Sequence, residues 1–99
     1  IITSGYNVYP SHVEEILTNH EAIMKCAVIG VKNESKGEIV KAFIVLREGY
    51  NNLLTKNNIQ KYMKENLAKF EIPREIRYID ELPTTLVGKI AYKELEKMD

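Results

Sequence analysis

Two apolar, β-branched runs separated by a short polar connection constrain the fold of this chain more than any other feature. The runs are "AIMKCAVIGV" at residues 22–31 and "IVKAFIVL" at residues 39–46. The connection between them, "KNESKGE", is charged and contains Gly37, which suits a turn. Two strands joined by so short a polar loop are predicted to pair antiparallel.

Helical patterns flank this strand pair on both sides. Over residues 11–19, Ser11 and Glu14 have the S-x-x-E spacing of a capping box, and the apolar residues behind them share one face. A second helix is predicted over residues 56–69, with Thr55 as its N-cap. Its apolar stripe indicates a core-facing helix and consists of Ile59, Tyr62, Met63 and Leu67.

The last third of the chain carries shorter signals. Residues 75–79, "EIRYI", follow Pro73 and predict a third strand, and "AYKELEK" at residues 91–97 predicts a short helix with Tyr92 and Leu95 facing inward. The strands are expected to pair without long crossovers. The expected fold class is α+β, a small and mainly antiparallel three-stranded sheet with helices packed on it, plus a short N-terminal β-ribbon.

Composition narrows the function classes. The 99 residues suit one domain, and 14 Lys and Arg balance 14 Asp and Glu, whereas nucleic-acid-binding domains usually carry a basic excess. No apolar run approaches the roughly 18 residues of a membrane span. Cys26 is the one cysteine and lies in an apolar run, which favours a buried structural thiol. A single unpaired cysteine fits a reducing compartment, so we expect a cytoplasmic location. Because the charges balance, we expect no nucleic-acid partners.

Few residues support catalysis by this chain alone. His12 and His20 have no Cys or carboxylate in ligand register, so no metal site is expected, and the serines lack a histidine partner. Gly5 in "TSGYN" marks either a bend in the ribbon or a point where backbone approaches a ligand. Lys89 follows Gly88 in "LVGKI" and is either a solvated charge or a mobile cation for a neighbouring domain's site.

Five blocks, taken in order, cover nearly all of the chain: "SGYNVYPSHVEEIL", "CAVIGV", "GEIVKAFIVL", "LAKFEIPREI" and "DELPTTLVGKIAYKEL". Together they resemble the C-terminal domain of the adenylate-forming superfamily, which includes acyl-CoA synthetases, nonribosomal-peptide adenylation domains and firefly luciferase. The segment "SGYNVYP" looks most like fatty-acyl and related acyl-CoA synthetases. Peptide-synthetase domains usually carry an R-G-Y-R-I-E-L-type segment at this place.

The resemblance implies a reaction in two halves. A carboxylic acid and Mg-ATP give an acyl-adenylate and pyrophosphate, and the thiol of coenzyme A then displaces AMP, while the small domain rotates against a large N-terminal domain. Lys89 matches the adenylation lysine of the family, and Gly88 lets its loop approach closely. Gly5 matches a glycine whose backbone lines the pantetheine tunnel. Phe70 aligns with an aromatic residue that stacks on the CoA adenine in some relatives, or it is a helix-end core residue.

Some positions depart from the family pattern. Thr84 replaces the first lysine of the L-P-K-T-x-x-G-K block, and the basic pair after G-K-I is replaced by Ala91, Tyr92 and Lys93. The chain opens "IITSGYNVYP" without an initiator methionine, so we expect residues 1–99 to be the lid of a longer acyl-CoA synthetase that acts on a carboxylic acid of the fatty-acid type. The absent N-terminal domain is expected to be its partner and to hold Mg²⁺, ATP and the acid. This piece alone is then expected to be inactive.

Two alternatives remain open from the sequence. The lid could belong to an adenylating ligase that loads a carrier protein in place of CoA. The chain could also be a free-standing, non-catalytic module that binds a partner on its small sheet.

Overall fold

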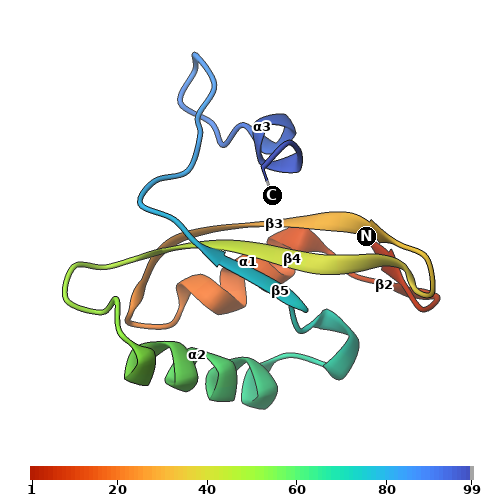
Figure 1. Ribbon diagram of the computed structural model, residues 1–99, viewed down its shortest axis with the longest axis horizontal. Coiled ribbons are helices and arrows are strands. Elements are labelled where there is room, and N and C mark those ends of the chain that lie inside the picture. The colour runs from red at the N-terminus through yellow and green to blue at the C-terminus, as the bar shows by residue number, and fades with distance from the viewer. Residues whose placement is uncertain (99) are drawn as a thin grey trace.

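The computed structural model describes residues 1–98, and the predicted strand pair forms its centre (Figure 1). β3 (Ile23–Asn33) and β4 (Gly37–Leu46) pair antiparallel along their whole length. The register runs from Ile23 opposite Leu46 to Asn33 opposite Gly37, with one irregularity just after Ile23. The antiparallel pairing predicted from the two apolar runs is therefore confirmed.

Three further strands complete the sheet on the other side of β4. The predicted N-terminal ribbon is made of β1 (Ile2–Thr3) and β2 (Tyr6–Asn7), and it joins the same sheet through Thr3, which pairs with Gly37 at the start of β4. β5 (Glu75–Tyr78) lies beside the middle of β4. The α+β class with a mainly antiparallel sheet is confirmed.

The direction of β5 corrects one expectation. β5 runs parallel to β4, so a long crossover connects the two strands. The expectation that the strands pair without long crossovers is therefore wrong for β5. This crossover contains α2 (Leu53–Asn66) and the short 3₁₀ helix η1 (Lys69–Glu71). A helix that returns the chain to the starting end of the previous strand makes the next strand parallel. The predicted helix between two predicted strands was the signal for this topology.

The first helix begins differently from its prediction. α1 (Pro10–Thr18) has Tyr9 at its N-cap position, with no capping hydrogen bond from a side chain. Proline suits the first helical position because its φ is already helical and its missing N–H is not needed there. Ser11 therefore lies inside the first turn, and the predicted capping box of Ser11 and Glu14 is wrong.

The second helix begins at Leu53 because Asn52, rather than the predicted Thr55, is its N-cap. The Asn52 Oδ1 accepts a hydrogen bond from the Thr55 backbone N–H at 2.8 Å. The predicted core-facing stripe is confirmed, since Ile59, Met63 and Leu67 are buried. Tyr62 is half-buried, and its hydroxyl donates to the Ile16 carbonyl oxygen at 2.6 Å, which ties α2 to α1.

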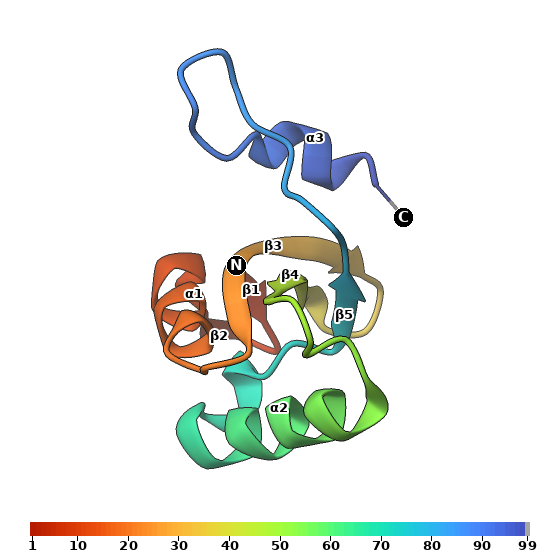
Figure 2. The ribbon, with the colours of Figure 1, turned by 90° about the vertical axis from the view of Figure 1, so that its left-hand side faces the viewer.

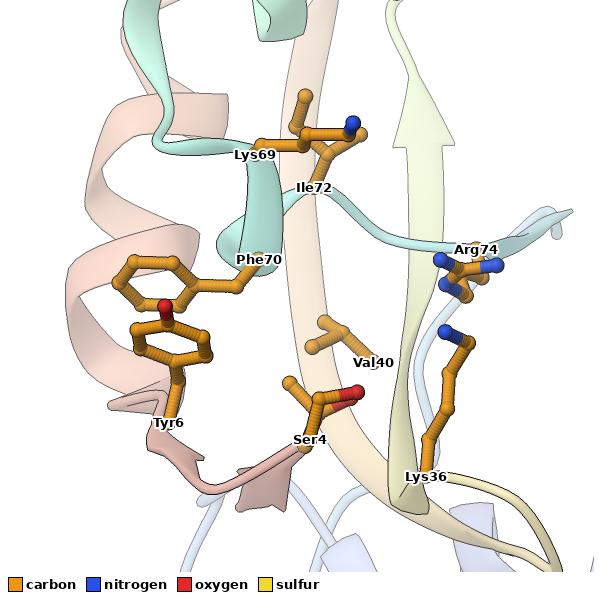
Figure 3. A pocket seen from close by; sticks show the side chains of 9 residues that line it. Ser4, Tyr6, Lys36, Val40, Lys69, Phe70, Ile72 and Arg74 are labelled. Atoms are coloured by element: carbon orange, nitrogen blue, oxygen red, sulfur yellow. The ribbon is translucent and has the colours of Figure 1, made fainter.

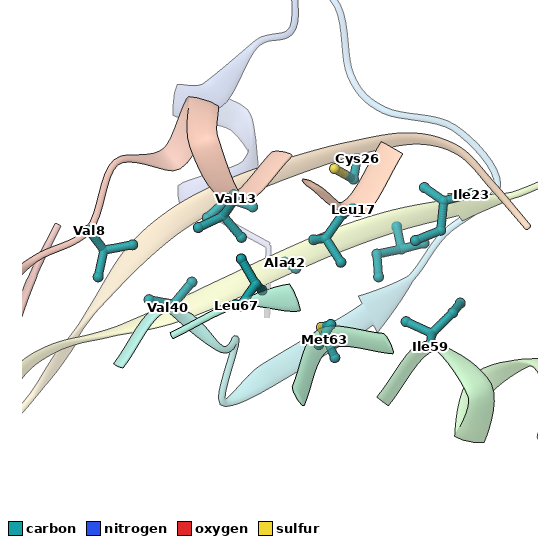
Figure 4. Close-up of a cluster of buried hydrophobic side chains, with 12 residues drawn as sticks. Val8, Val13, Leu17, Ile23, Cys26, Val40, Ala42, Ile59, Met63 and Leu67 are labelled. Carbon is teal, nitrogen blue, oxygen red and sulfur yellow. The ribbon is translucent and has the colours of Figure 1, made fainter. Parts of the chain in front are cut away.

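Both faces of the β3–β4 hairpin are covered. After the irregularity that follows Ile23, the buried residues at even positions of the two strands face α1 and α2, which lie together on one side of the sheet (Figures 1 and 2). Figure 4 shows this first core from close by. Its members include Val13, Leu17, Cys26, Val28, Val40, Ala42, Ile44, Ile59 and Met63.

Residues at odd positions face the C-terminal segment, which crosses to the opposite side of the sheet (Figure 2). This second core consists of Ala27, Ile29, Phe43, Val45, Leu82 and Leu95. Leu95 comes from α3 (Tyr92–Glu96) and is fully buried, as predicted. The prediction that Tyr92 faces inward is wrong, because this side chain remains 38% exposed.

Cys26 belongs to the first core. It is 5% exposed, and burial, followed by the negative charge of Glu14, raises the pKa of its thiol to about 12. A thiol with so high a pKa is a poor nucleophile at neutral pH, which confirms the structural interpretation. Within residues 1–98, the helices are all too short or too polar to cross a membrane.

Leu95→Ala is expected to lower the free energy of unfolding by about 2–5 kcal/mol, because it leaves a cavity between α3 and the sheet. Leu86→Ala is the control on the same C-terminal segment. Leu86 is fully exposed, so its truncation should change the free energy of unfolding by less than about 0.5 kcal/mol. Urea unfolding followed by circular dichroism measures both variants, and equal midpoints would contradict the packing of α3 on the sheet.

Candidate functional site

Lys89 lies in a tight hairpin of its own, residues 84–90, which we call the Lys89 hairpin. Thr84 and Ile90 form an isolated antiparallel bridge at its base. The Thr85 backbone N–H donates to the Lys89 carbonyl oxygen at 2.7 Å, and the Gly88 N–H donates back to the Thr85 carbonyl at 2.9 Å. Gly88 has φ +82°, a left-handed conformation that favours glycine, so it allows the chain to reverse here.

The Lys89 hairpin presents its tip to solvent and anchors its base in the fold. Figure 1 shows it extending away from the sheet, on the side that α3 covers. Leu86 and Val87 at the tip are 107% and 80% exposed, and Lys89 is also exposed. At the base, Leu82 is buried in the second core. An ammonium group is therefore held on an ordered projection, free to enter a site on another surface.

Gly5 lies in the turn between β1 and β2, far along the sheet from the Lys89 hairpin. It has φ +84°, and a Cβ added to it would meet no atom within 4 Å. Ser4 beside it also has a positive φ, 49°, and the turn is tied down by a hydrogen bond from the Ser4 N–H to the Lys36 carbonyl oxygen at 2.8 Å. Backbone conformation, and not lack of space within this chain, accounts for glycine at this position.

Phe70 is a surface residue, and this exposure excludes one of the two roles expected for it. It lies in η1, is 36% exposed and stacks on Tyr6, with 4.5 Å between ring centroids and 12° between ring planes. It is therefore no helix-end core residue. Tyr6 covers one face of the Phe70 ring, so a planar ligand group has the other face or the edges of this pair to contact.

Beside this stacked pair lies a surface hollow of about 240 Å³, shown in Figure 3. We call it the cationic hollow, because Lys36, Lys69 and Arg74 line it together with the two rings. In Figure 3, the side chains of Lys36 and Arg74 reach toward each other at the wall opposite the rings. Its other lining residues are Thr3, Ser4, Val40 and Ile72.

Sequence reasoning missed these three cations. Lys36 belongs to the β3–β4 turn, Lys69 to η1, and Arg74 to the segment just before β5. No spacing in the sequence indicates that they converge, because only the crossover through α2 and η1 brings the last two beside the ribbon. Chemically, a cluster of cations next to an aromatic pair suits a ligand with phosphate groups and a flat ring.

The structure groups the predicted site residues into two places. Gly5 and Phe70 lie at the ribbon end of the sheet, linked through Tyr6, which follows Gly5 in the chain and stacks on Phe70. Gly88 and Lys89 lie together in the hairpin on the α3 side. Figure 1 shows the two places apart, with the ribbon at one end of the sheet and the hairpin projecting on the side that α3 covers.

Both histidines are engaged in contacts within the chain. His12 Nε2 lies 3.6 Å from the Glu71 carboxylate. His20 is buried, with its Nδ1 accepting from the Ala22 N–H at 3.0 Å and its Nε2 2.7 Å from Asn58 Oδ1. Since Nδ1 accepts, Nε2 carries the proton and donates to Asn58. Across residues 1–98, no group of three or more His, Cys, Asp or Glu side chains is arranged to hold a metal ion.

Comparison with known proteins places this geometry in context. A family model described as the AMP-binding enzyme C-terminal domain matches residues 12–89. Over 95 residues the chain is 41% identical to a long-chain-fatty-acid–CoA ligase of Bacillus subtilis, and the match covers 96% of this chain and 17% of that relative.

Two solved structures are similar in both fold and sequence. ATP-bound MatB from Rhodopseudomonas palustris has a TM-score of 0.88 and 30% identity, over 98% of this chain and 19% of that one. The o-succinylbenzoate CoA synthetase of Bacillus subtilis, in complex with the acyl-adenylate intermediate OSB-AMP, has a TM-score of 0.84 and 30% identity, over 96% of this chain and 19% of that one. This chain thus spans less than a fifth of these relatives, and it belongs to the family of AMP-binding enzyme C-terminal domains.

Proposed function

We propose that this chain is the mobile C-terminal domain of an acyl-CoA synthetase, which activates a carboxylic acid with ATP and transfers the acyl group to coenzyme A. The observation that carries the proposal is the presence of two separate exposed surfaces on one sheet. The Lys89 hairpin serves the first half-reaction, and the ribbon end with Gly5 and the cationic hollow serves the second. The names of the relatives, which are CoA ligases and synthetases, support this assignment.

In the first half-reaction, Lys89 acts on substrates bound in the N-terminal domain. A carboxylate oxygen of the acid attacks the α-phosphorus of ATP, a new O–P bond forms, and pyrophosphate leaves with the electrons of the broken P–O bond. Negative charge gathers around the α-phosphate as the bond forms. The Lys89 ammonium, carried on an ordered hairpin, bridges the carboxylate and the nucleotide and stabilises that charge. Mg²⁺ is assigned to the N-terminal domain.

In the second half-reaction, the domain turns its ribbon end toward the acyl-adenylate. The backbone at Gly5 lines the path of the pantetheine arm, whose sulfur attacks the acyl carbon and displaces AMP. The cationic hollow receives the nucleotide end of CoA, with phosphates near Lys36, Lys69 and Arg74. The adenine stacks on the free face of Phe70 or replaces Tyr6 on the other face.

The cationic hollow favours CoA over a carrier protein as the acyl acceptor. Both acceptors present a phosphopantetheine arm, but only CoA adds an adenine ring and further phosphate groups. A hollow with three cations beside an aromatic pair has a use for those groups. A free-standing binding module is not favoured, because matched relatives carry this domain as less than a fifth of a longer chain. We propose a fatty or related acid as the substrate, on the name of the Bacillus relative.

Lys89→Ala in the full-length enzyme is expected to slow adenylate formation by about 10²–10³-fold, the usual cost of losing one preorganised charge stabiliser. CoA transfer from preformed acyl-adenylate should stay near the parent rate, because that step uses the ribbon end. Lys93→Ala removes another exposed cation nearby and is the control, expected to leave both rates unchanged. Pyrophosphate release and acyl-CoA yield are the two assays, and a Lys89→Ala enzyme that forms adenylate normally would refute this role.

Gly5→Leu in the full-length enzyme is expected to impair CoA transfer more than adenylate formation, because its side chain enters the path of the pantetheine arm. Gly49→Leu is the matched control. Gly49 also has a positive φ, +88°, and open space around its Cβ position, so the backbone strain is comparable. The same two assays apply. If Gly49→Leu has the same selective effect, or if Gly5→Leu impairs both half-reactions equally, Gly5 has no tunnel role.

Phe70→Ala in the full-length enzyme is expected to raise the KM for CoA by about tenfold, since a base–aromatic stack is worth roughly 1–3 kcal/mol. Pantetheine, which lacks the nucleotide, serves as the control acceptor, and its KM should not change. Steady-state acyl transfer with each acceptor provides the measurement. Equal increases in the KM for CoA and for pantetheine would show that the substitution disturbs the surrounding structure and not the recognition of adenine.

A further inference from the structure

Glu14 reaches around the outer edge of β3 and touches the C-terminal segment. Its Oε2 accepts a hydrogen bond from the Val28 backbone N–H at 2.9 Å and another from the Tyr92 hydroxyl at 2.7 Å. Glu14 belongs to α1, which lies on one side of the sheet, whereas Tyr92 begins α3 on the other side (Figure 2). One carboxylate therefore joins three elements across the edge of the sheet.

The contact with Val28 accounts for the place of Glu14. β3 is an edge strand, and its outward backbone N–H groups need an acceptor other than a neighbouring strand. Glu14 is half-buried in the middle of α1, where an ordinary helix glutamate would extend into solvent. The hydrogen bond from the Val28 N–H fixes the position of the Glu14 Oε2. The Tyr92 hydroxyl therefore has an acceptor in a fixed position.

α3 depends on a small number of contacts for its orientation. It has 5 residues, and Leu95 is its buried side chain. At its far end, Lys41 Nζ donates to the Met98 carbonyl oxygen at 3.5 Å. Ile90 and Met98, just outside its two ends, also pack against the second core but are only partly buried. The Tyr92–Glu14 hydrogen bond opposes a rotation of α3 about Leu95 at the end nearest the Lys89 hairpin.

The Tyr92 hydroxyl is well suited to hold this contact. Burial, and then the hydrogen bond to the Glu14 carboxylate and its charge, raise the pKa of Tyr92, so the hydroxyl keeps its proton at every physiological pH. A hydroxyl that donates to a carboxylate at 2.7 Å belongs to the stronger class of hydrogen bonds.

The path from Tyr92 to Lys89 is short and hydrogen-bonded. Ala91 precedes Tyr92, and its N–H donates to the Pro83 carbonyl oxygen at 2.8 Å, which closes the base of the hairpin. Ile90 pairs with Thr84 immediately above that bond. A shift of the backbone at Tyr92 is therefore passed to the C-terminal arm of the Lys89 hairpin, whose other arm is anchored through Leu82.

We infer that Glu14 and Tyr92 form a latch that sets the angle between the Lys89 hairpin and the sheet, and that both are positioning residues for adenylate formation. This inference rests on the proposed role of Lys89. Neither side chain touches the reacting atoms, and both act through the hairpin that carries the lysine. A purely structural contact would support both half-reactions equally, whereas the latch acts on the first half alone.

The test uses the full-length enzyme and the variant Tyr92→Phe, which removes the hydroxyl and keeps the ring. Adenylate formation is expected to fall about tenfold in kcat, the size expected for one charge-assisted hydrogen bond, with little change in KM for ATP. CoA transfer from preformed acyl-adenylate should be unchanged. Tyr9→Phe, which removes the hydroxyl of a 66% exposed tyrosine next to α1, is the control and should change neither rate.

A second pair of variants separates positioning from stability. In an enzyme that already carries Lys89→Ala, Tyr92→Phe should cause no further loss of adenylate formation, because the latch has no lysine left to position. Tyr92→Arg places a guanidinium donor near Glu14 and should restore most of the rate lost in Tyr92→Phe. Hydrogen exchange of the peptide spanning residues 83–92 should be faster in Tyr92→Phe than in the parent.

Four results would overturn the latch. Equal loss in both half-reactions, or a further loss in the Lys89→Ala background, would make the contact structural only. Parent-like adenylate formation in Tyr92→Phe would also overturn it while leaving the role of Lys89 intact. If Lys89→Ala alone forms adenylate normally, the proposed function of Lys89 fails first, and the positioning role fails with it.

Discussion

Burial of both faces of the β3–β4 hairpin is the constraint on which the rest of this structure depends. β4 is buried at every position from Ile39 to Val45, whereas a strand with one solvated face would alternate buried and exposed residues. Each face therefore needs its own cover. α1 and α2 cover one face, and the chain then passes through β5 to the other side and covers it with Leu82 and Leu95.

The need for two covers also separates the two candidate functional surfaces. The segment that covers the second face carries the Lys89 hairpin, which projects away from the sheet. The ribbon with Gly5 lies elsewhere, beside the turn that joins β3 to β4, where Thr3 pairs with Gly37. A domain built in this way has two separate exposed surfaces, because each cover of the sheet carries one of them. The proposed division of work between two half-reactions would follow from the covering of both faces of a small sheet.

The candidate site residues of this domain lie on ordered projections from a packed centre. Lys89 stands on a hairpin closed by backbone hydrogen bonds, and Gly5 stands in a turn tied to Lys36. Glu14 is also fixed by the backbone, at the edge of the sheet. Its carboxylate accepts a hydrogen bond from an edge-strand N–H and connects α1 to α3. Exposed groups gain precision because the backbone that carries them has few free rotations.

The sequence by itself determined the elements whose signals are local, namely the antiparallel pair, the stripe of α2 and the glycine loops around Gly5 and Lys89. Periodicity and turn residues act over a few positions, so they can be read without the fold. Only the tertiary structure decided the parallel course of β5, the turn of Glu14 away from its predicted cap, and the cationic hollow beside Phe70. These features join residues that are distant in the chain, and packing of the crossover and of α3 brings them together. No local pattern records such contacts.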